Sequence, residues 1–228
     1  MPLDFSDRKA GAAPSRSCSE PTTAISTTPS PCATSSPAAA DDWAEVRRWR
    51  KEQRASLIAA RVAAGPRQRG VWDEAITAQI LNGVPNLEWL VVGFYWPFKG
   101  EYDVRRIARQ LHARGTRLAL PVVVEKNQPL VFRPWTPDAK MVPGIWNIPV
   151  PAEGPAVEPD ALLVPLVGFD ADGYRLGYGG GYYDRTLASL RRKPLTIGVG
   201  FELAELPTIH PQPHDIAMDA IVTEARFE

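Results

Sequence analysis

The residues with the clearest chemical potential form a glycine-rich stretch at positions 168–185, GFDADGYRLGYGGGYYDR. Four of its glycines lie within five positions: Gly177, Gly179, Gly180 and Gly181. Such a backbone can adopt positive φ, and before a helix it can point free N–H groups at an anion. The stretch therefore predicts either a phosphate-binding loop or a purely structural glycine turn. It matches neither a Walker A loop nor a dinucleotide-binding loop, because no Gly-Lys-Ser/Thr follows and Tyr182 replaces the third glycine.

An acidic residue follows the glycines. Asp184 falls in the first turn of the helix expected after the loop, where a carboxylate can simply interact with the helix dipole. Alternatively, it can bind Mg²⁺, because this hard cation prefers carboxylate oxygens beside phosphate. Asp215 and Asp219, in the segment PHDIAMD, are then the candidates for a second carboxylate.

A third patch, FYWPFKGEYD at positions 94–103, combines aromatic and charged side chains. Trp96 and its aromatic neighbours, with Lys99 and Glu101, suit a flat heterocycle that carries amide and amine groups. The segment WNIP adds a further aromatic residue, Trp146. The same residues would also suit the packed edge of a lid, and both interpretations stay open.

The N-terminal part of the chain contains a basic helical pattern. It predicts a helix that begins near Asp41 and ends at Gly65-Pro66. At about 100° per residue, one arc of this helix gathers five cations: Arg47, Arg50, Lys51, Arg54 and Arg61. This arc is either a solvated charged face or a surface that contacts an anion.

The elements that must position these residues alternate between strand and helix. Short β-branched apolar runs predict four strands, at 88–95, 117–124, 161–167 and 196–201. Helices are expected at 68–81, 102–114 and 182–192. This order indicates a mainly parallel sheet that binds ligands at the carboxyl ends of its strands. Residues 130–133 are expected to add an antiparallel strand, and residues 134–159 an ordered surface loop.

Composition separates a tail from a single domain. The first 40 residues contain 8 Ala, 8 Ser, 5 Thr and 6 Pro. We expect this segment to be disordered, and a transit peptide is the functional alternative. Residues 41–228 are then one α/β catalytic domain.

The charge balance limits the possible partners. The 26 lysines and arginines equal the 26 aspartates and glutamates, so the chain has no overall positive field to attract nucleic acid. No apolar run approaches the roughly 20 residues that span a bilayer. We therefore expect a cytoplasmic monomer that binds small molecules rather than nucleic acid or a membrane.

Several of these motifs occur together and in a fixed order over residues 43–224. A basic helix is followed by KGEYD after an aromatic strand end, then by WNIP, LLVPLV and the glycine motif. This combination resembles the 5-formyltetrahydrofolate cyclo-ligase family, also called 5,10-methenyltetrahydrofolate synthetases. The resemblance implies a three-layer Rossmann-like α/β fold. It also implies ATP- and Mg²⁺-dependent conversion of 5-formyltetrahydrofolate to 5,10-methenyltetrahydrofolate, ADP and phosphate.

The resemblance also implies roles for individual residues. The ATP site falls on Arg50, Arg54, Arg175, Leu176, Gly177, Tyr178, Gly179, Gly180, Gly181, Tyr182 and Tyr183. The folate site falls on Trp96, Glu101, Trp146, Tyr178, Gly179, Gly180, Gly181 and Tyr182. The magnesium ligands are Asp184 and Asp215, and the catalytic residues are Arg175, Tyr182 and Asp184.

The implied mechanism needs no protein nucleophile. The formyl oxygen attacks the γ-phosphate to form an imidate phosphate, and the neighbouring secondary amine of the folate then closes the ring as phosphate leaves. The protein must align the reacting atoms and neutralise charge on the phosphoryl oxygens, which N–H groups, arginines and Mg²⁺ can do.

One departure from the family pattern concerns the charge of the glycine loop. Family members often carry basic residues where this chain has Tyr178 and Gly180. The candidates to replace the missing charge are Arg175, Arg185, Lys99 and Lys140. Two alternative functions follow: an ATP-dependent ligase or kinase that acts on another pteridine-like substrate, and a non-catalytic folate- or nucleotide-binding paralogue.

Overall fold

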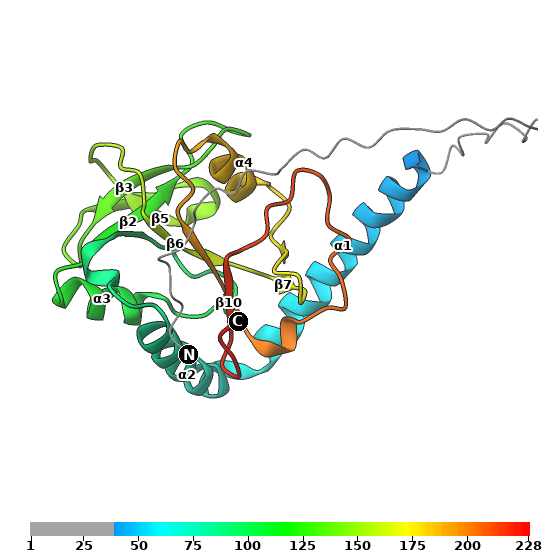
Figure 1. The fold of residues 1–228 in the computed structure, drawn as a ribbon, viewed down its shortest axis with the longest axis horizontal. Coiled ribbons are helices and arrows are strands. Elements are labelled where there is room, and N and C mark those ends of the chain that lie inside the picture. Colours follow the sequence, from blue (N-terminus) through cyan, green and yellow to red (C-terminus); the bar gives the residue numbers. More distant parts are fainter. Residues whose placement is uncertain (1–38) are drawn as a thin grey trace, which may run out of the picture.

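A six-stranded sheet forms the centre of the computed structural model, which describes residues 39–228 (Figure 1). Its strands lie in the order β10-β9-β6-β1-β2-β3. Their bounds are Val91–Gly93 for β1, Arg117–Val122 for β2, Val131–Trp135 for β3, Ala161–Pro165 for β6, Leu195–Val199 for β9 and Ala220–Val222 for β10. All neighbouring pairs are parallel except β2 and β3. The expected mainly parallel sheet is therefore confirmed, as is the antiparallel addition.

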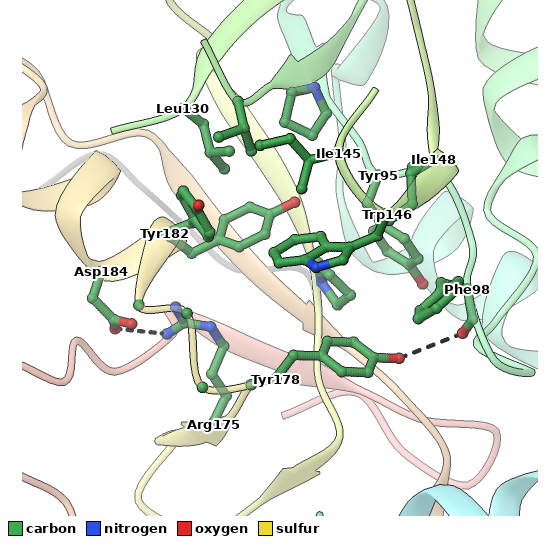
Figure 2. Close-up of a pocket in the computed structure, with 18 of the residues that line it drawn as sticks. Tyr95, Phe98, Leu130, Ile145, Trp146, Ile148, Arg175, Tyr178, Tyr182 and Asp184 are labelled. Carbon is green, nitrogen blue, oxygen red and sulfur yellow. Dashed lines mark hydrogen bonds and ion pairs between the residues drawn. The ribbon is translucent and has the colours of Figure 1, made fainter. Parts of the chain in front are cut away.

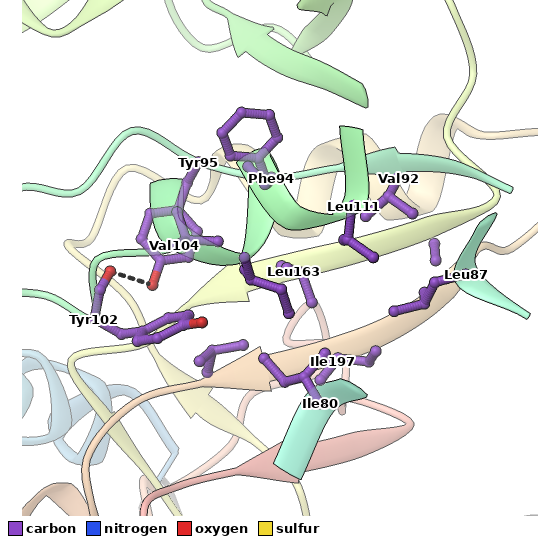
Figure 3. Close-up of a cluster of buried hydrophobic side chains, with 14 of the residues drawn as sticks. Ile80, Leu87, Val92, Phe94, Tyr95, Tyr102, Val104, Leu111, Leu163 and Ile197 are labelled. Carbon is purple, nitrogen blue, oxygen red and sulfur yellow. Dashed lines mark hydrogen bonds between the residues drawn. The ribbon is translucent and has the colours of Figure 1, made fainter. Parts of the chain in front are cut away.

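Helices cover both faces of this sheet (Figure 1). They are α2 (Gly65–Gly83), α3 (Arg105–Ala113) and α4 (Tyr182–Ser189). Successive strand residues point to opposite faces, and in β6 Leu163 packs with Ile80 of α2 and Leu111 of α3 (Figure 3). The preceding residue, Leu162, packs with Leu187 of α4 instead. Two hydrophobic clusters thus hold the three layers together, in agreement with the expected Rossmann-like α/β fold.

The longest helix, α1 (Ala39–Ala63), extends away from the sheet (Figure 1). It begins at Ala39 rather than near Asp41, and α2 begins directly after it, at Gly65. The segment 1–40, expected to be disordered, lies outside the described residues except for its last two. α1 contacts β7 (Gly168–Phe169) and the 3₁₀ helix η3 (Glu202–Ala204), so its basic side chains lie near the glycine-rich segment.

Element boundaries differ from the sequence-based expectation in several places. The strand expected at 88–95 is reduced to β1, because a 3₁₀ turn at Leu87–Trp89 precedes it. The helix expected at 102–114 begins at Arg105, where the Asp103 carboxylate accepts a hydrogen bond from the Arg105 backbone N–H at 3.2 Å. Strand β10 was not expected, since it has only three residues.

The proline-rich stretch 134–159 contains regular secondary structure, although it was expected to be an ordered surface loop. It contains an antiparallel hairpin made of β4 (Met141–Pro143) and β5 (Pro149–Pro151), with the short 3₁₀ helix η2 (Ile145–Asn147) at its tip. A second small hairpin pairs β7 with β8 (Arg175–Leu176) and leads into the glycines. The two hairpins carry Trp146 and the glycine loop, respectively, to the same end of the sheet. Among the described helices, none is long and apolar enough to cross a membrane.

Candidate active site

A cavity of about 540 Å³ opens at the carboxyl ends of β2 and β6, the edge at which parallel sheets bind ligands (Figure 2). Pro121 and Val122 of β2 and Pro165 of β6 form part of its wall. The residues that the family resemblance assigns to the ATP, folate and magnesium sites line this one cavity: residues 175–184, Arg50, Arg54, Trp96, Glu101, Trp146 and Asp215. The structure therefore brings these residues together, and their individual roles stay predictions. Asp219, the other candidate carboxylate, does not line it and instead accepts hydrogen bonds from Lys193 and Thr196.

The glycine loop reaches the cavity in a conformation that requires glycine. Gly179 has φ 94° and Gly181, which immediately precedes α4, has φ 62°. A Cβ atom at Gly180 would lie 2.8 Å from the Tyr182 ring. Since the first residues of α4 line the cavity, the positive end of that helix faces it. This geometry is compatible with a phosphate-binding loop, and the structural constraints on the glycines apply in either case.

Two arginines of α1 lie against this loop and the segment opposite. Arg54 donates from Nε to the Gly177 carbonyl oxygen at 2.6 Å. Arg50 donates to the carbonyl oxygens of Ile209 and His210, at 3.0 and 2.9 Å, and pairs with the Asp215 carboxylate. Burial and then the charge of Arg50 lower the pKa of Arg54. Two neighbouring guanidinium groups at a cavity wall form a favourable site for an anion such as phosphate.

The two aspartates expected as magnesium ligands are neighbours in space. Oδ1 of Asp184 accepts hydrogen bonds from Nη1 of Arg175 at 3.1 Å and from the backbone N–H of Ile216 at 3.2 Å. Because Ile216 directly follows Asp215, both carboxylates lie on the same side of the cavity. Over the described part of the chain, no group of three or more Asp, Glu, His or Cys side chains is arranged to hold a metal ion. Two carboxylates suit a cation that takes its other ligands from phosphate and water.

Glu101 is the buried carboxylate at the other end of the cavity. Its side chain accepts a hydrogen bond from the Phe98 N–H at 2.8 Å and another from the Tyr178 hydroxyl at 2.9 Å. The residue is 8% exposed, and burial raises its pKa to about 7. The turn that carries it requires positive φ at Lys99 (47°) and at Gly100 (74°).

Aromatic rings form the walls between these two ends. The Trp146 ring packs edge-on to Tyr182, with centroids 6.1 Å apart, and Phe98 lies 6.0 Å from Tyr178 (Figure 2). Trp146 is 64% exposed and has φ 55°, a left-handed conformation that a bulky residue rarely adopts. An exposed, strained tryptophan at a cavity is typical of a ligand-binding position rather than of core packing. The aromatic side chains expected to form a slot therefore line the cavity, and their role in ligand binding stays a prediction.

The structure separates the four candidates for the missing loop charge. Arg175 lines the cavity but is paired with Asp184. Arg185 donates to the Gly180 carbonyl oxygen at 2.6 Å and lies over the Tyr182 ring. Lys99 lines the cavity, whereas Arg185 and Lys140 are not among the described side chains that do.

Several wall residues were not expected from the sequence. They are apolar residues of the strand ends and the η2 hairpin, together with one histidine: Val122, Leu130, Ile145, Ile148, Val150 and His214. The rule that ligands bind at carboxyl ends of parallel strands would have found Val122. Ile145, Ile148 and Val150 belong to a hairpin that the proline-rich sequence did not reveal. Leu130 directly precedes β3, and His214 directly precedes Asp215.

Comparison with known proteins gives a consistent result. The profile of the 5-formyltetrahydrofolate cyclo-ligase family matches residues 46–224. The 5-formyltetrahydrofolate cyclo-ligase of Escherichia coli K12 is 29% identical over 173 residues, which cover 73% of this chain and 95% of that enzyme. The Haemophilus influenzae enzyme of the same name is 31% identical over 148 residues, covering 60% and 79% respectively.

Solved structures agree with the sequence comparison. The NMR structure of the Aquifex aeolicus 5,10-methenyltetrahydrofolate synthetase superimposes with a TM-score of 0.68 at 30% identity and covers 78% of this chain and 91% of that one. The region matched by the family profile, residues 46–224, spans most of α1, the sheet and the glycine loop. The chain belongs to the 5-formyltetrahydrofolate cyclo-ligase family.

Proposed function

We propose that the protein uses ATP and Mg²⁺ to convert 5-formyltetrahydrofolate to 5,10-methenyltetrahydrofolate, with release of ADP and phosphate. The observation that carries this proposal is one cavity with two chemically different ends. A glycine loop and two arginines lie at one end, and a buried carboxylate in an aromatic slot lies at the other. Membership of the cyclo-ligase family supports the same reaction.

The glycine-loop end, made of Arg50, Arg54, Asp184, Asp215 and the backbone of residues 177–181, is proposed to bind the ATP phosphates. Arg54 already lies against the loop, through its bond to the Gly177 carbonyl oxygen. Arg50 is held by Asp215, so phosphate binding would exchange part of an existing ion pair for a new one. Guanidinium groups bind phosphate with paired hydrogen bonds, which orient the γ-phosphate as well as attract it.

Asp184 and Asp215 are proposed to be the residues that would hold Mg²⁺. Both carboxylates line the cavity, and Oδ2 of Asp184 accepts no hydrogen bond from the described residues. The donors are hard oxygens, which suits Mg²⁺, and their small number suits a cation that arrives with the nucleotide. When bound, the ion would neutralise charge on the phosphoryl oxygens during transfer.

The Glu101 end, made of Trp96, Phe98, Glu101, Trp146 and the Tyr178 side chain, is proposed to bind the folate. The pterin ring carries N–H donors on one edge, which a buried carboxylate can accept while aromatic side chains contact its faces. The guanidinium of Arg105 lies 5.4 Å from the Trp96 ring and helps to fix its orientation.

The chemistry then requires alignment rather than a protein nucleophile. The formyl oxygen attacks the γ-phosphorus, the bond to the bridging oxygen breaks, and ADP leaves. The secondary amine of the folate next attacks the imidate carbon and loses its proton, and phosphate leaves with the former formyl oxygen. Arg175 and Tyr182 also line the cavity, and they are proposed to hold the transferring group in position.

The test is incubation of the purified protein with 5-formyltetrahydrofolate, ATP and Mg²⁺ while the near-ultraviolet absorbance of the methenyl product is recorded. We expect product and ADP to form in equal amounts, and no product when ATP is omitted. Tetrahydrofolate, which has no formyl oxygen, serves as the matched control and should not stimulate ADP release. Binding of both ligands without turnover would indicate the non-catalytic paralogue instead, and turnover of a different pteridine alone would indicate a changed substrate.

A monomer should be sufficient for this activity. All side chains proposed for the two ends come from one chain, and they already line one cavity. Light scattering at the concentration used for the assay checks this expectation, and the cytoplasmic location stays a prediction.

A further inference from the structure

The Arg61 side chain is buried, although it belongs to the basic arc of α1. It is 4% exposed, whereas the adjacent Val62 is 50% exposed. Its guanidinium donates to the carbonyl oxygens of Lys99 and Leu166 at 3.1 and 3.3 Å, and to the Tyr178 hydroxyl at 2.8 Å. The group therefore joins α1, the Glu101 turn, the end of β6 and the glycine loop.

The donor and acceptor groups determine the direction of the hydrogen bonds that link Arg61, Tyr178 and Glu101. Arginine has only donors, so the Tyr178 oxygen must accept from Arg61. The hydroxyl proton is then free to be donated, and Oε1 of Glu101 lies 2.9 Å away. The alternative acceptor, the Phe98 carbonyl oxygen, is more distant at 3.4 Å. Burial raises the pKa of Tyr178, so the phenol keeps this proton at physiological pH.

Glu101 faces few groups that can stabilise its charge. The other phenols near it are Tyr95, which donates to the Tyr102 carbonyl oxygen, and Tyr183, whose hydroxyl has no hydrogen-bond partner among the described residues. Burial raises the pKa of Glu101 to about 7, and the charge of Arg61 is the largest opposing influence, ahead of the bonds from Phe98 and Tyr178. The Lys99 ammonium lies over the Phe98 ring.

We propose that Arg61, acting through the Tyr178 hydroxyl, is a positioning residue that holds Glu101 as an aligned, charged acceptor for the pterin ring. This inference rests on the proposed function, because it concerns the folate end of that site. The Tyr178 hydroxyl links the two groups, because it accepts a hydrogen bond from Arg61 and donates one to Glu101.

A purely structural role for Arg61 is the alternative. Its bonds to two backbone carbonyl oxygens tie α1 to the body of the protein, and their loss would lower stability and weaken all ligands alike. A positioning role instead changes only the pH range over which folate binds. The proton on Glu101 competes with the ligand, so folate binding is strong above the pKa of Glu101 and falls as the pH drops through it.

The experiment measures binding of 5-formyltetrahydrofolate by calorimetry, without ATP, between pH 5.5 and 9. Two variants are compared with the unchanged protein: Tyr178→Phe, which leaves both carbonyl bonds of Arg61 intact, and Arg61→Gln, which removes the charge. Matched controls are Tyr174→Phe and Arg67→Gln, which remove a hydroxyl and a guanidinium outside the cavity wall. ATP binding is measured in parallel.

For the unchanged protein we expect affinity to fall about tenfold per pH unit well below pH 7. In Tyr178→Phe the midpoint should move to higher pH, so that binding is about fivefold weaker at pH 7 and within about twofold of normal at pH 9. Arg61→Gln, if it folds, should move the midpoint further in the same direction. Both variants should bind ATP with unchanged affinity. The two control variants should bind both ligands as the unchanged protein does.

Two results would overturn the inference while leaving the proposed function in place. One is an unchanged pH midpoint in Tyr178→Phe, and the other is an equal loss of affinity at every pH. Failure of the proposed function has a different signature, because the unchanged protein would then bind no 5-formyltetrahydrofolate at any pH.

Discussion

At the glycine-loop end of the cavity each aspartate is paired directly with an arginine, whereas at the Glu101 end a carboxylate meets an arginine only through a tyrosine hydroxyl. In the first arrangement each carboxylate is neutralised by a guanidinium, and the proposed binding of phosphate and Mg²⁺ would exchange these partners. The second holds one carboxylate in place with two neutral donors, the Phe98 N–H and the Tyr178 hydroxyl. We therefore expect the glycine-loop end to respond to magnesium and the Glu101 end to respond to pH.

The largest effect that would test this contrast is expected for Asp184→Asn. Asparagine retains an oxygen that can accept from Arg175, but it lacks the charge that Mg²⁺ prefers. We expect kcat/KM to fall about 100-fold, equivalent to about 2.7 kcal/mol, with partial recovery as magnesium is raised. Steady-state kinetics at limiting and saturating Mg²⁺ measure this. A folded variant with near-normal activity at limiting magnesium would contradict the metal role and leave Asp184 as a helix-terminal carboxylate.

A smaller effect, on folate binding rather than on the response to magnesium, is expected for Glu101→Gln. The amide removes the charge and one acceptor, so the affinity for 5-formyltetrahydrofolate should fall about 10- to 50-fold, within the range for losing a hydrogen bond to a charged group. The pH dependence of folate binding near pH 7 should disappear, because the titrating group is gone. The KM for ATP should stay within about twofold of normal. Equal weakening of both ligands would show that the two ends of the cavity are not separable.

The converse substitution at the glycine-loop end is Arg54→Gln. Loss of the guanidinium that contacts the loop should raise the KM for ATP about tenfold, the low end for a charge-assisted contact. Binding of 5-formyltetrahydrofolate without ATP should change by less than about twofold. The matched control, Arg67→Gln, removes an exposed arginine of α2 and should leave both constants unchanged. A loss of folate affinity in Arg54→Gln would contradict the assignment of Arg54 to the glycine-loop end.

The smallest effect is expected from removal of residues 1–38. Their composition includes few large apolar side chains, so both ends of the cavity should keep their affinities. Differential scanning calorimetry should show a change in Tm below about 4 °C, which corresponds to about 1 kcal/mol for a domain of this size. A larger drop would show that this segment contributes to the stability of the catalytic domain.

Sequence patterns were most informative where one residue type determines a local structure. The apolar β-branched runs predicted the central parallel strands, because strands buried on both faces need continuous hydrophobic sequence. The spacing of Gly179 and Gly181 predicted a loop with positive φ, because few other residues adopt that conformation readily. By contrast, β10 and the β4–β5 hairpin were missed, because three-residue strands are too short to show a period.

The sequence by itself determined the chemistry available to this protein: a glycine loop before a helix, a set of acids and arginines, an aromatic patch, and a family resemblance that the comparisons confirm. Only the tertiary structure decided which of these groups face one another. Arg50 meets Asp215 across 165 positions, and Arg61 meets Tyr178 across 117. Helical periodicity placed Arg50 and Arg61 on the same arc but could not tell a cavity arginine from a buried one. That difference arises because α1 packs against β7 and η3, and burial depends on the distant segments that pack against each turn of the helix.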